Sequence, residues 1–172
     1  WVAPHNPFDL ATINLLDASL PPAWQEGANP KFWLGTDDQG RDVFSAILFG
    51  MRVSLAIGVA SVILSIVLGV GLGLLSGYVG GRVDAFIMRV CDVMLSFPAI
   101  LVALLIDGVF RALLPRDAHG DVAFAVLILA IALSGWVQYA RTVRGSTMVE
   151  KNKEYVQAAR VIGVRPVMIM FK

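Results

Sequence analysis

The hydrophobic and polar positions of the chain alternate between long uncharged stretches and short charged ones. Val53–Gly77 contains 25 residues without a charged side chain or histidine, Val122–Ala140 contains 19 and Val93–Ile106 contains 14. About 20 apolar residues in an α-helix cross the hydrocarbon core of a bilayer. The pattern therefore predicts an all-α, polytopic transmembrane helical bundle. The predicted order of elements is span 53–77, loop 78–89, span 90–106, loop 107–121 and span 122–140.

The second span is the least regular, because Asp92 and Pro98 interrupt its apolar pattern. A carboxylate inside a membrane is costly and by default indicates a functional group. Asp92, however, lies near one end of the span and three positions from Arg89, on the same helix face. We therefore interpret it as the partner of Arg89 at the membrane surface, with a role in a transport path as the alternative. Pro98 is expected to kink the helix, which neighbouring helices can tolerate.

Small residues recur at every fourth position of the first span. At 3.6 residues per turn they form a narrow stripe along which another helix can approach closely. We expect this stripe to pack against another helix of the same chain, and a seam between two chains is the alternative. The stripe consists of Ser61, Ser65, Gly69, Gly73 and Gly77.

The segment before the first span combines a proline-rich stretch with a short helix. Five prolines within the first 30 residues indicate an extended loop, since proline lacks a backbone donor and fixes φ. Thr36–Gln39 has the form of a capping box, a hydroxyl followed three residues later by Gln. Apolar residues at helical spacing follow in residues 43–51, so we expect a short amphipathic helix that leads into the span. A helix on the membrane surface and a helix that docks a partner are equally open.

The segment after the third span predicts a helix–turn–helix elbow. Residues 154–162 are compatible with a short helix, Gly163 stands where a C-cap glycine is expected, and Pro166 can occupy the first turn of a new helix. The alternative is an amphipathic loop on the bilayer surface. Ala158 and Ala159 offer little apolar depth for lipid but allow the close approach of a protein groove, which favours the elbow.

Charge gives the predicted spans an orientation. Residues 1–52 contain three Lys or Arg and six Asp or Glu, a balance of −3, whereas residues 141–172 contain seven and two, a balance of +5. Basic segments close to membrane spans remain in the cytoplasm. We therefore expect three regions: an extracytoplasmic loop and amphipathic helix in 1–52, three spans in 53–140, and a cytoplasmic segment in 141–172. An odd number of spans agrees with this arrangement.

Composition removes several classes of protein. Of the 172 residues, 57% are hydrophobic and 16% charged, which is below the roughly 25% charged residues of a soluble domain. The single cysteine, Cys91, cannot form an internal disulfide, and His5 and His119 have no ligand-spaced companions, so no metal site is expected. A net charge of +1 gives no reason to expect nucleic acid as a partner. No catalytic constellation and no G-x-x-x-x-G-K-[ST] motif occurs in the sequence, so we expect neither an enzyme nor a cofactor.

Four separated motifs resemble the permease subunits of ABC importers, in particular the dipeptide, oligopeptide and nickel subgroup. The segment Gln157-Ala158-Ala159-x-x-x-Gly163 is similar to the EAA loop of that family, with Gln where Glu is usual. The resemblance covers nearly the whole chain, which would hold three of six expected spans and be a piece of a longer protein. The other motifs are Leu34 to Val43 followed by Gly50 to Leu55, Gly77-Tyr78-x-Gly80-Gly81-x-x-Asp84, and Asp92 with Phe97-Pro98.

The resemblance implies a subunit that forms the translocation path of a binding-protein-dependent importer in a bacterial inner membrane, with peptides as the default substrate. Its implied partners are two ATP-binding ABC subunits that hydrolyse the ATP, a second permease subunit, an extracytoplasmic solute-binding protein and the lipid bilayer. The elbow would be the coupling helix that docks on an ATP-binding subunit. A membrane scaffold or a secondary-transporter fragment is the alternative. The implied contact residues are Glu154, Tyr155, Gln157, Ala158, Ala159, Arg160 and Gly163.

Overall fold

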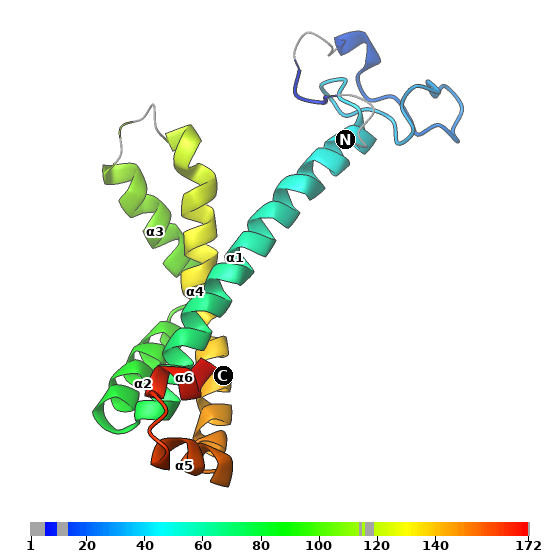
Figure 1. Ribbon diagram of the computed structural model, residues 1–172. Coiled ribbons are helices and arrows are strands. Elements are labelled where there is room, and N and C mark those ends of the chain that lie inside the picture. Colours follow the sequence, from blue (N-terminus) through cyan, green and yellow to red (C-terminus); the bar gives the residue numbers. More distant parts are fainter. Residues whose placement is uncertain (1–5, 10–13, 114, 116–118, 172) are drawn as a thin grey trace. The chain divides into compact units, whose positions relative to one another are not determined.

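The computed structural model describes residues 6–9, 14–113, 115 and 119–171, and the regular structure of these residues is helical apart from an isolated β-bridge (Figure 1). The predicted all-α fold class is confirmed. The chain forms two compact units, Trp1–Ala56 and Ile57–Lys172. The elements are the 3-10 helix η1 (Leu15–Asp17) and the α-helices α1 (Val43–Val79), α2 (Gly81–Ser96), α3 (Ala99–Leu113), α4 (His119–Glu150), α5 (Glu154–Val161) and α6 (Pro166–Phe171).

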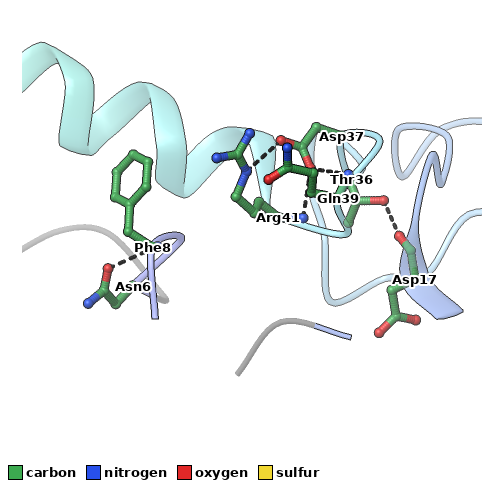
Figure 2. A network of polar contacts seen from close by, with 7 residues as sticks. All are labelled: Asn6, Phe8, Asp17, Thr36, Asp37, Gln39 and Arg41. Carbon is green, nitrogen blue, oxygen red and sulfur yellow. Dashed lines mark hydrogen bonds and ion pairs between the residues drawn. The ribbon is translucent and has the colours of Figure 1, made fainter. Parts of the chain in front are cut away.

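Polar contacts hold together the loop of the first unit. The hydroxyl of Thr36 donates to the carbonyl of Asp17 and accepts the backbone N–H of Leu20 at 2.9 Å. The carboxylate of Asp37 accepts the backbone N–H of Arg41 at 2.9 Å and its Nε at 2.7 Å (Figure 2). Burial raises the pKa of Asp37, but its hydrogen bonds, chiefly from Arg41, outweigh burial and lower the pKa below the usual value. The folded loop therefore favours the ionised carboxylate form of Asp37.

The predicted capping box at Thr36–Gln39 is wrong, because α1 begins later, at Val43. Asp42 is the capping residue: its carboxylate accepts the backbone N–H of Ser45 at 3.1 Å and the Ser45 hydroxyl at 2.5 Å. An Asp at this position satisfies backbone donors that the first helical turn leaves open. The Thr36 hydroxyl is occupied by contacts within the loop, and that tertiary arrangement decides between the two candidate caps.

α1 is a single helix of 37 residues, so the short amphipathic helix predicted before the first span is its first part. Neither Gly50 nor Arg52 interrupts it. At 1.5 Å per residue the helix is about 55 Å long, which exceeds the hydrocarbon core of about 30 Å. It ends at Val79, and the chain then turns at Gly80 and Gly81, whose φ angles of +69° and +55° favour glycine.

The rest of the predicted loop 78–89 is wrong, since α2 begins immediately at Gly81. The charged residues of this segment suggested a loop, but they lie on an amphipathic helix. Arg82 and Arg89 are exposed, whereas Ile87 and Cys91 on the other face are buried. A short segment that mixes charged and apolar residues is ambiguous by pattern alone.

The second predicted span is broken into two helices. α2 and α3 meet at an angle of 94°. Pro98 has no backbone N–H to donate, and Phe97 before it is extended, with φ −100° and ψ 134°, as expected for a residue preceding proline. The predicted kink is therefore a complete break. By length and hydropathy, α1 and α4 can each cross a membrane, and α2 with α3 adds a third crossing only if the bent pair is one span.

α3 and α4 extend past their predicted boundaries. α3 ends at Leu113 and α4 begins at His119, so much of the predicted loop 107–121 is helical, and residues 114 and 116–118 lie outside the described part. α4 continues for ten residues beyond the predicted span end at Ala140. Charged residues mark the end of an apolar span, but Arg and Lys are good helix formers and do not end a helix.

The second unit packs around α4. Ile87 and Cys91 of α2 are buried together with Trp136, Val137 and Ala140 of α4. α2 and α3 both contact α4, and α3 lies beside the first half of α4 (Figure 1). This packing brings the polar ends of α1, α2 and α4 close together.

Candidate functional site

The small-residue stripe of α1 packs against the second half of α4. A Cβ added to Gly69 would lie 2.5 Å from the Cβ of Tyr139. One added to Gly73 would lie 2.6 Å from the carbonyl oxygen of Ala140. Side-chain atoms do not approach so closely, so the helix separation at these positions requires glycine. The stripe is thus buried within the chain.

The remaining members of the stripe continue the same seam. The Ser65 hydroxyl donates to the carbonyl oxygen of Ala132 at 3.2 Å. Ser61 is buried too, and its hydroxyl has no hydrogen-bond partner among the described residues. Gly77 faces Thr147, whose Cβ would be 2.7 Å from an added Cβ. The spacing in the sequence located the stripe, and the structure identifies α4 as the helix that it contacts.

Beside the stripe, the carboxylate of Asp84 on α2 connects three helices. Its Oδ2 accepts a hydrogen bond from Nη2 of Arg144 on α4 at 2.6 Å. Its Oδ1 accepts a hydrogen bond from Nε of the same arginine. The same oxygen also accepts a hydrogen bond from the hydroxyl of Ser76 on α1 at 2.5 Å. Two parallel N–H···O bonds fix the orientation as well as the distance of an Arg–carboxylate pair. We call Asp84, Arg144 and Ser76 the Asp84 clamp.

Lys151 forms a second link, between the C-terminal end of α1 and the residue that follows α4. Its Nζ donates to the carbonyl oxygen of Gly77 at 2.7 Å. The last carbonyls of a helix lack intrahelical donors and carry the negative end of the helix dipole, so a cation is favourable there. Sequence reasoning missed both this contact and the clamp. The available signal was the eight-residue spacing of Asp84 and Asp92, which places both carboxylates on one face of a helix.

The predicted pairing of Asp92 with Arg89 is wrong, because Asp92 forms an ion pair with Arg141 of α4. This partner is present because α4 continues past Ala140 and carries Arg141 alongside α2. The Asp92 side chain is 59% exposed and that of Arg141 is 44% exposed. Exposed ion pairs contribute only about 0–1 kcal/mol to stability. The second ion pair between α2 and α4, in the Asp84 clamp, is less exposed, with 29% of the Arg144 side chain and 16% of the Asp84 side chain accessible.

One face of α5 is attached to the ends of the long helices. The guanidinium of Arg160 lies 4.9 Å from the ring centroid of Tyr78, a cation–π contact with the end of α1. The hydroxyl of Tyr155 donates to the Glu150 carboxylate at 2.5 Å, and this hydrogen bond raises the pKa of Tyr155. Val156 on the same short helix is buried. A displacement of α5 would therefore act directly on α1 and α4.

The other face of α5 is exposed and partly apolar. Ala158, Val161 and Ile162 are spaced by three and four residues and so share one face. Val161 is 86% exposed and Ile162 is 78% exposed. We call these three residues the outer face of α5. Sequence reasoning included Ala158 but missed Val161 and Ile162, although their helical spacing from Ala158 was a usable signal.

The structure divides the predicted contact residues between these two faces. Tyr155 and Arg160 are exposed but hold α5 to the bundle through the contacts described above. Ala159 is half-buried. Glu154, Gln157, Ala158 and Gly163 are the exposed members that form no hydrogen bond, ion pair or ring contact with α1 or α4 within the described residues.

The predicted elbow after α5 is present and has the geometry of a Schellman motif. The N–H of Gly163 donates to the carbonyl of Arg160 at 3.1 Å, and the N–H of Val164 donates to that of Ala159 at 3.0 Å. Gly163 has φ +81°, a left-handed conformation that favours glycine. α6 then begins at Pro166, as the sequence predicted.

A cavity of about 380 Å³ lies behind the elbow. Its walls include Tyr78 of α1, Thr142 and Ser146 of α4, and Tyr155 and Val156 of α5. The described residues contain no group of three or more His, Cys, Asp or Glu that could hold a metal ion. The described arrangement suits the transmission of movement between helices, since its polar groups connect helices to one another.

Comparison with known proteins decides the family. Residues 69–172, which include the Asp84 clamp and the elbow, match the family described as binding-protein-dependent transport system inner membrane component. The chain belongs to this family. It is therefore an inner membrane component with several spans, and the resemblance to importer permeases noted in its motifs is confirmed.

Individual members of the family are similar over most of the chain. The dipeptide transport system permease protein DppC of Escherichia coli K12 is 44% identical over 171 residues, 99% of this chain and 53% of that protein. The oligopeptide transport system permease protein OppC of Bacillus subtilis is 36% identical over 165 residues, 96% and 49% respectively. The glutathione transport system permease protein GsiD of Pectobacterium atrosepticum is 40% identical over 147 residues, 86% and 46%. The chain spans about half the length of these curated relatives.

Proposed function

We propose that the chain is the part of an ABC importer permease that couples ATP-driven movement to the transport of short peptides. The observation that carries this proposal is α5, a short helix with one face attached to α1 and α4 and an apolar outer face that is exposed. The family assignment supports a role in binding-protein-dependent import. The named relatives act in dipeptide, oligopeptide and glutathione transport systems, and these names support short peptides as the substrate class.

The outer face of α5 fits the docking of a short helix in a protein groove. Short amphipathic helices are recognised through apolar residues spaced three and four apart, as Ala158, Val161 and Ile162 are. The small side chain of Ala158 allows close approach, and Gly163 turns the chain away after the helix. Arg165 follows the helix and suits an acidic rim on the partner, whereas Lys153 before the helix is paired with Glu150 at 2.7 Å.

We assign the groove to an ATP-binding subunit of the same importer. Closure of two such subunits on ATP would displace α5, and with it the ends of α1 and α4, which shifts the spans between outward-open and inward-open states. The driving force is the difference in affinity of the ATP-bound partner for the two states, and no chemistry in this chain is needed. The other proposed partners are a second permease subunit and an extracytoplasmic solute-binding protein.

The proposal also assigns sides of the membrane. Residues 1–52, with a charge balance of −3, lie outside, and residues 141–172, with a balance of +5, lie in the cytoplasm. The positive-inside rule supports this orientation. It is also required by the docking of α5 on a subunit that uses cytoplasmic ATP.

Site-specific photocross-linking tests the docking of α5. A photoreactive residue at exposed Ala158, in the full-length protein in its native membrane, is expected to capture an ATP-binding subunit. The same residue at exposed Gln25, in the segment assigned to the outside, is the matched control and should capture none. Capture of an ATP-binding subunit from Gln25, or its absence from Ala158 when the subunits co-purify, would contradict both the docking surface and the orientation.

A further inference from the structure

The ends of three helices converge on the carboxylate of Asp84. Ser76, three residues before the end of α1, is fully buried and donates its hydroxyl to this carboxylate. Arg144, six residues before the end of α4, donates two N–H groups to it. The side chain of Asp84 is only 16% exposed. One carboxylate thus accepts hydrogen bonds from two neighbouring helices while standing on a third.

The same region is connected to α5. Gly77 and Tyr78 follow Ser76 directly, and they contact Lys151 and Arg160 respectively. Three consecutive residues at the end of α1 are therefore held by groups on or next to α2, α4 and α5. A displacement of α5 relative to α1 would have to break these contacts or carry all of these helix ends with it.

We propose that Asp84 is a positioning residue that fastens the ends of α1, α2 and α4 into one block, so that a displacement of α5 moves the three helices together. This inference rests on the proposed function for its transport readout, but the block itself is a property of the structure. Without the clamp, α2 and α4 keep the buried cluster around Cys91 and the exposed Asp92–Arg141 pair. The start of α2 then loses its polar connection to the ends of α1 and α4, so the helices that support α5 are held together less firmly.

The two ion pairs between α2 and α4 provide a matched comparison. Both join an Asp of α2 to an Arg of α4, and each can be neutralised by an Asp-to-Asn change that alters the size of the side chain very little. They differ in that Asp84 also bonds Ser76 of α1 and is largely buried, whereas Asp92 is 59% exposed. A role that depends on the three-helix connection should therefore appear in Asp84→Asn and not in Asp92→Asn.

The transport experiment uses the assembled importer in proteoliposomes and measures peptide moved per ATP hydrolysed. For Asp84→Asn this ratio should fall by at least about fivefold, the lower end of typical coupling between distant sites, while ATP-binding subunits still co-purify. For Asp92→Asn it should stay within about twofold of wild type, as expected for an exposed pair. An unchanged ratio in Asp84→Asn, or equal losses in both variants, would overturn the proposal.

A second variant, Ser76→Ala, tests the same proposal if Asp84→Asn fails to assemble. Ser76→Ala removes only the hydroxyl from α1 and leaves the ion pair between α2 and α4 in place. It should lower the ratio in the same direction by a smaller factor, and Asp84→Glu, which keeps the charge, should retain more coupling than Asp84→Asn. A wild-type ratio in Ser76→Ala would show that the connection to α1 has no role and would reject the block.

A distance measurement separates the failure of this inference from a failure of the proposed function. Spin labels at exposed Val161 of α5 and exposed Val83 of α2 report the distance between these helices in the full-length protein. Asp84→Asn should broaden the distance distribution, and Asp92→Asn should leave it unchanged. If wild-type protein shows no ATP-dependent uptake but the broadening occurs, the proposed function fails and the block stands; an unaltered distribution in Asp84→Asn rejects the block.

Discussion

Replacing Gly163 by valine is expected to reduce ATP-dependent uptake by tenfold or more while the protein still inserts in the membrane. Gly163 has φ +81°, and a β-branched residue in this conformation costs about 1–3 kcal/mol, so the turn between α5 and α6 should rearrange. A Cβ at this position would meet no other atom within 4 Å, which means that crowding makes no contribution. The effect should therefore come from the backbone alone.

The control for this prediction is Gly163→Asn at the same position. Asn tolerates the left-handed conformation far better than valine, so it should retain most of the uptake. Uptake and the amount of co-purifying ATP-binding subunit are measured for both variants. Wild-type uptake in Gly163→Val, with those subunits bound, would show that the shape of the elbow does not matter for coupling.

Replacing Gly73 by leucine is expected to separate α1 from α4 and to destabilise the second unit by about 1–3 kcal/mol, the usual cost of forcing extra atoms into a packed interface. An added Cβ at Gly73 would lie 2.6 Å from the carbonyl oxygen of Ala140 and 2.9 Å from the Cβ of Val143. The first contact is with backbone, which cannot turn aside as a flexible side chain can. Thermal melting of the purified full-length protein in detergent should shift down by several degrees.

Gly71 supplies the matched control for the packing prediction. It lies two residues away on the same helix, and a Cβ there would meet nothing within 4 Å. The free energy of unfolding of Gly71→Leu should therefore stay within about 0.5 kcal/mol of the wild-type value, as is usual for surface substitutions. Equal melting temperatures for Gly73→Leu and wild type would mean that the seam between α1 and α4 is not closed in the folded protein.

The features that the sequence predicted well are those set by local spacing. The four-residue repeat of small side chains located the seam of α1, because that repeat follows the geometry of a helix whatever its partner. The positive φ angles at Gly80, Gly81 and Gly163 were also predictable, since glycine adopts them readily. The first turn of α6 at Pro166 follows from the missing N–H of proline in the same way.

The features that the sequence did not reveal depend on contacts between distant residues. Asp92 had Arg89 within reach on its own helix, and only the packing of α4 on α2 shows that Arg141 is the partner. Thr36 had the form of a cap, but Asp17, far away in the sequence, binds its hydroxyl. The ends of the spans were misplaced for a related reason: hydropathy reports where charge begins, whereas a helix ends at a backbone feature such as Pro98.

Uptake of a radiolabelled dipeptide distinguishes an ATP-driven importer from a secondary transporter. It is measured in proteoliposomes that contain the full-length protein with its partner subunits and solute-binding protein. With ATP supplied on the side of the ATP-binding subunits, uptake should proceed without an ion gradient and should stop when a non-hydrolysable ATP analogue replaces ATP. Uptake that ignores ATP and follows a proton gradient instead would identify a secondary transporter and would contradict the assignment of this chain to an ATP-driven importer.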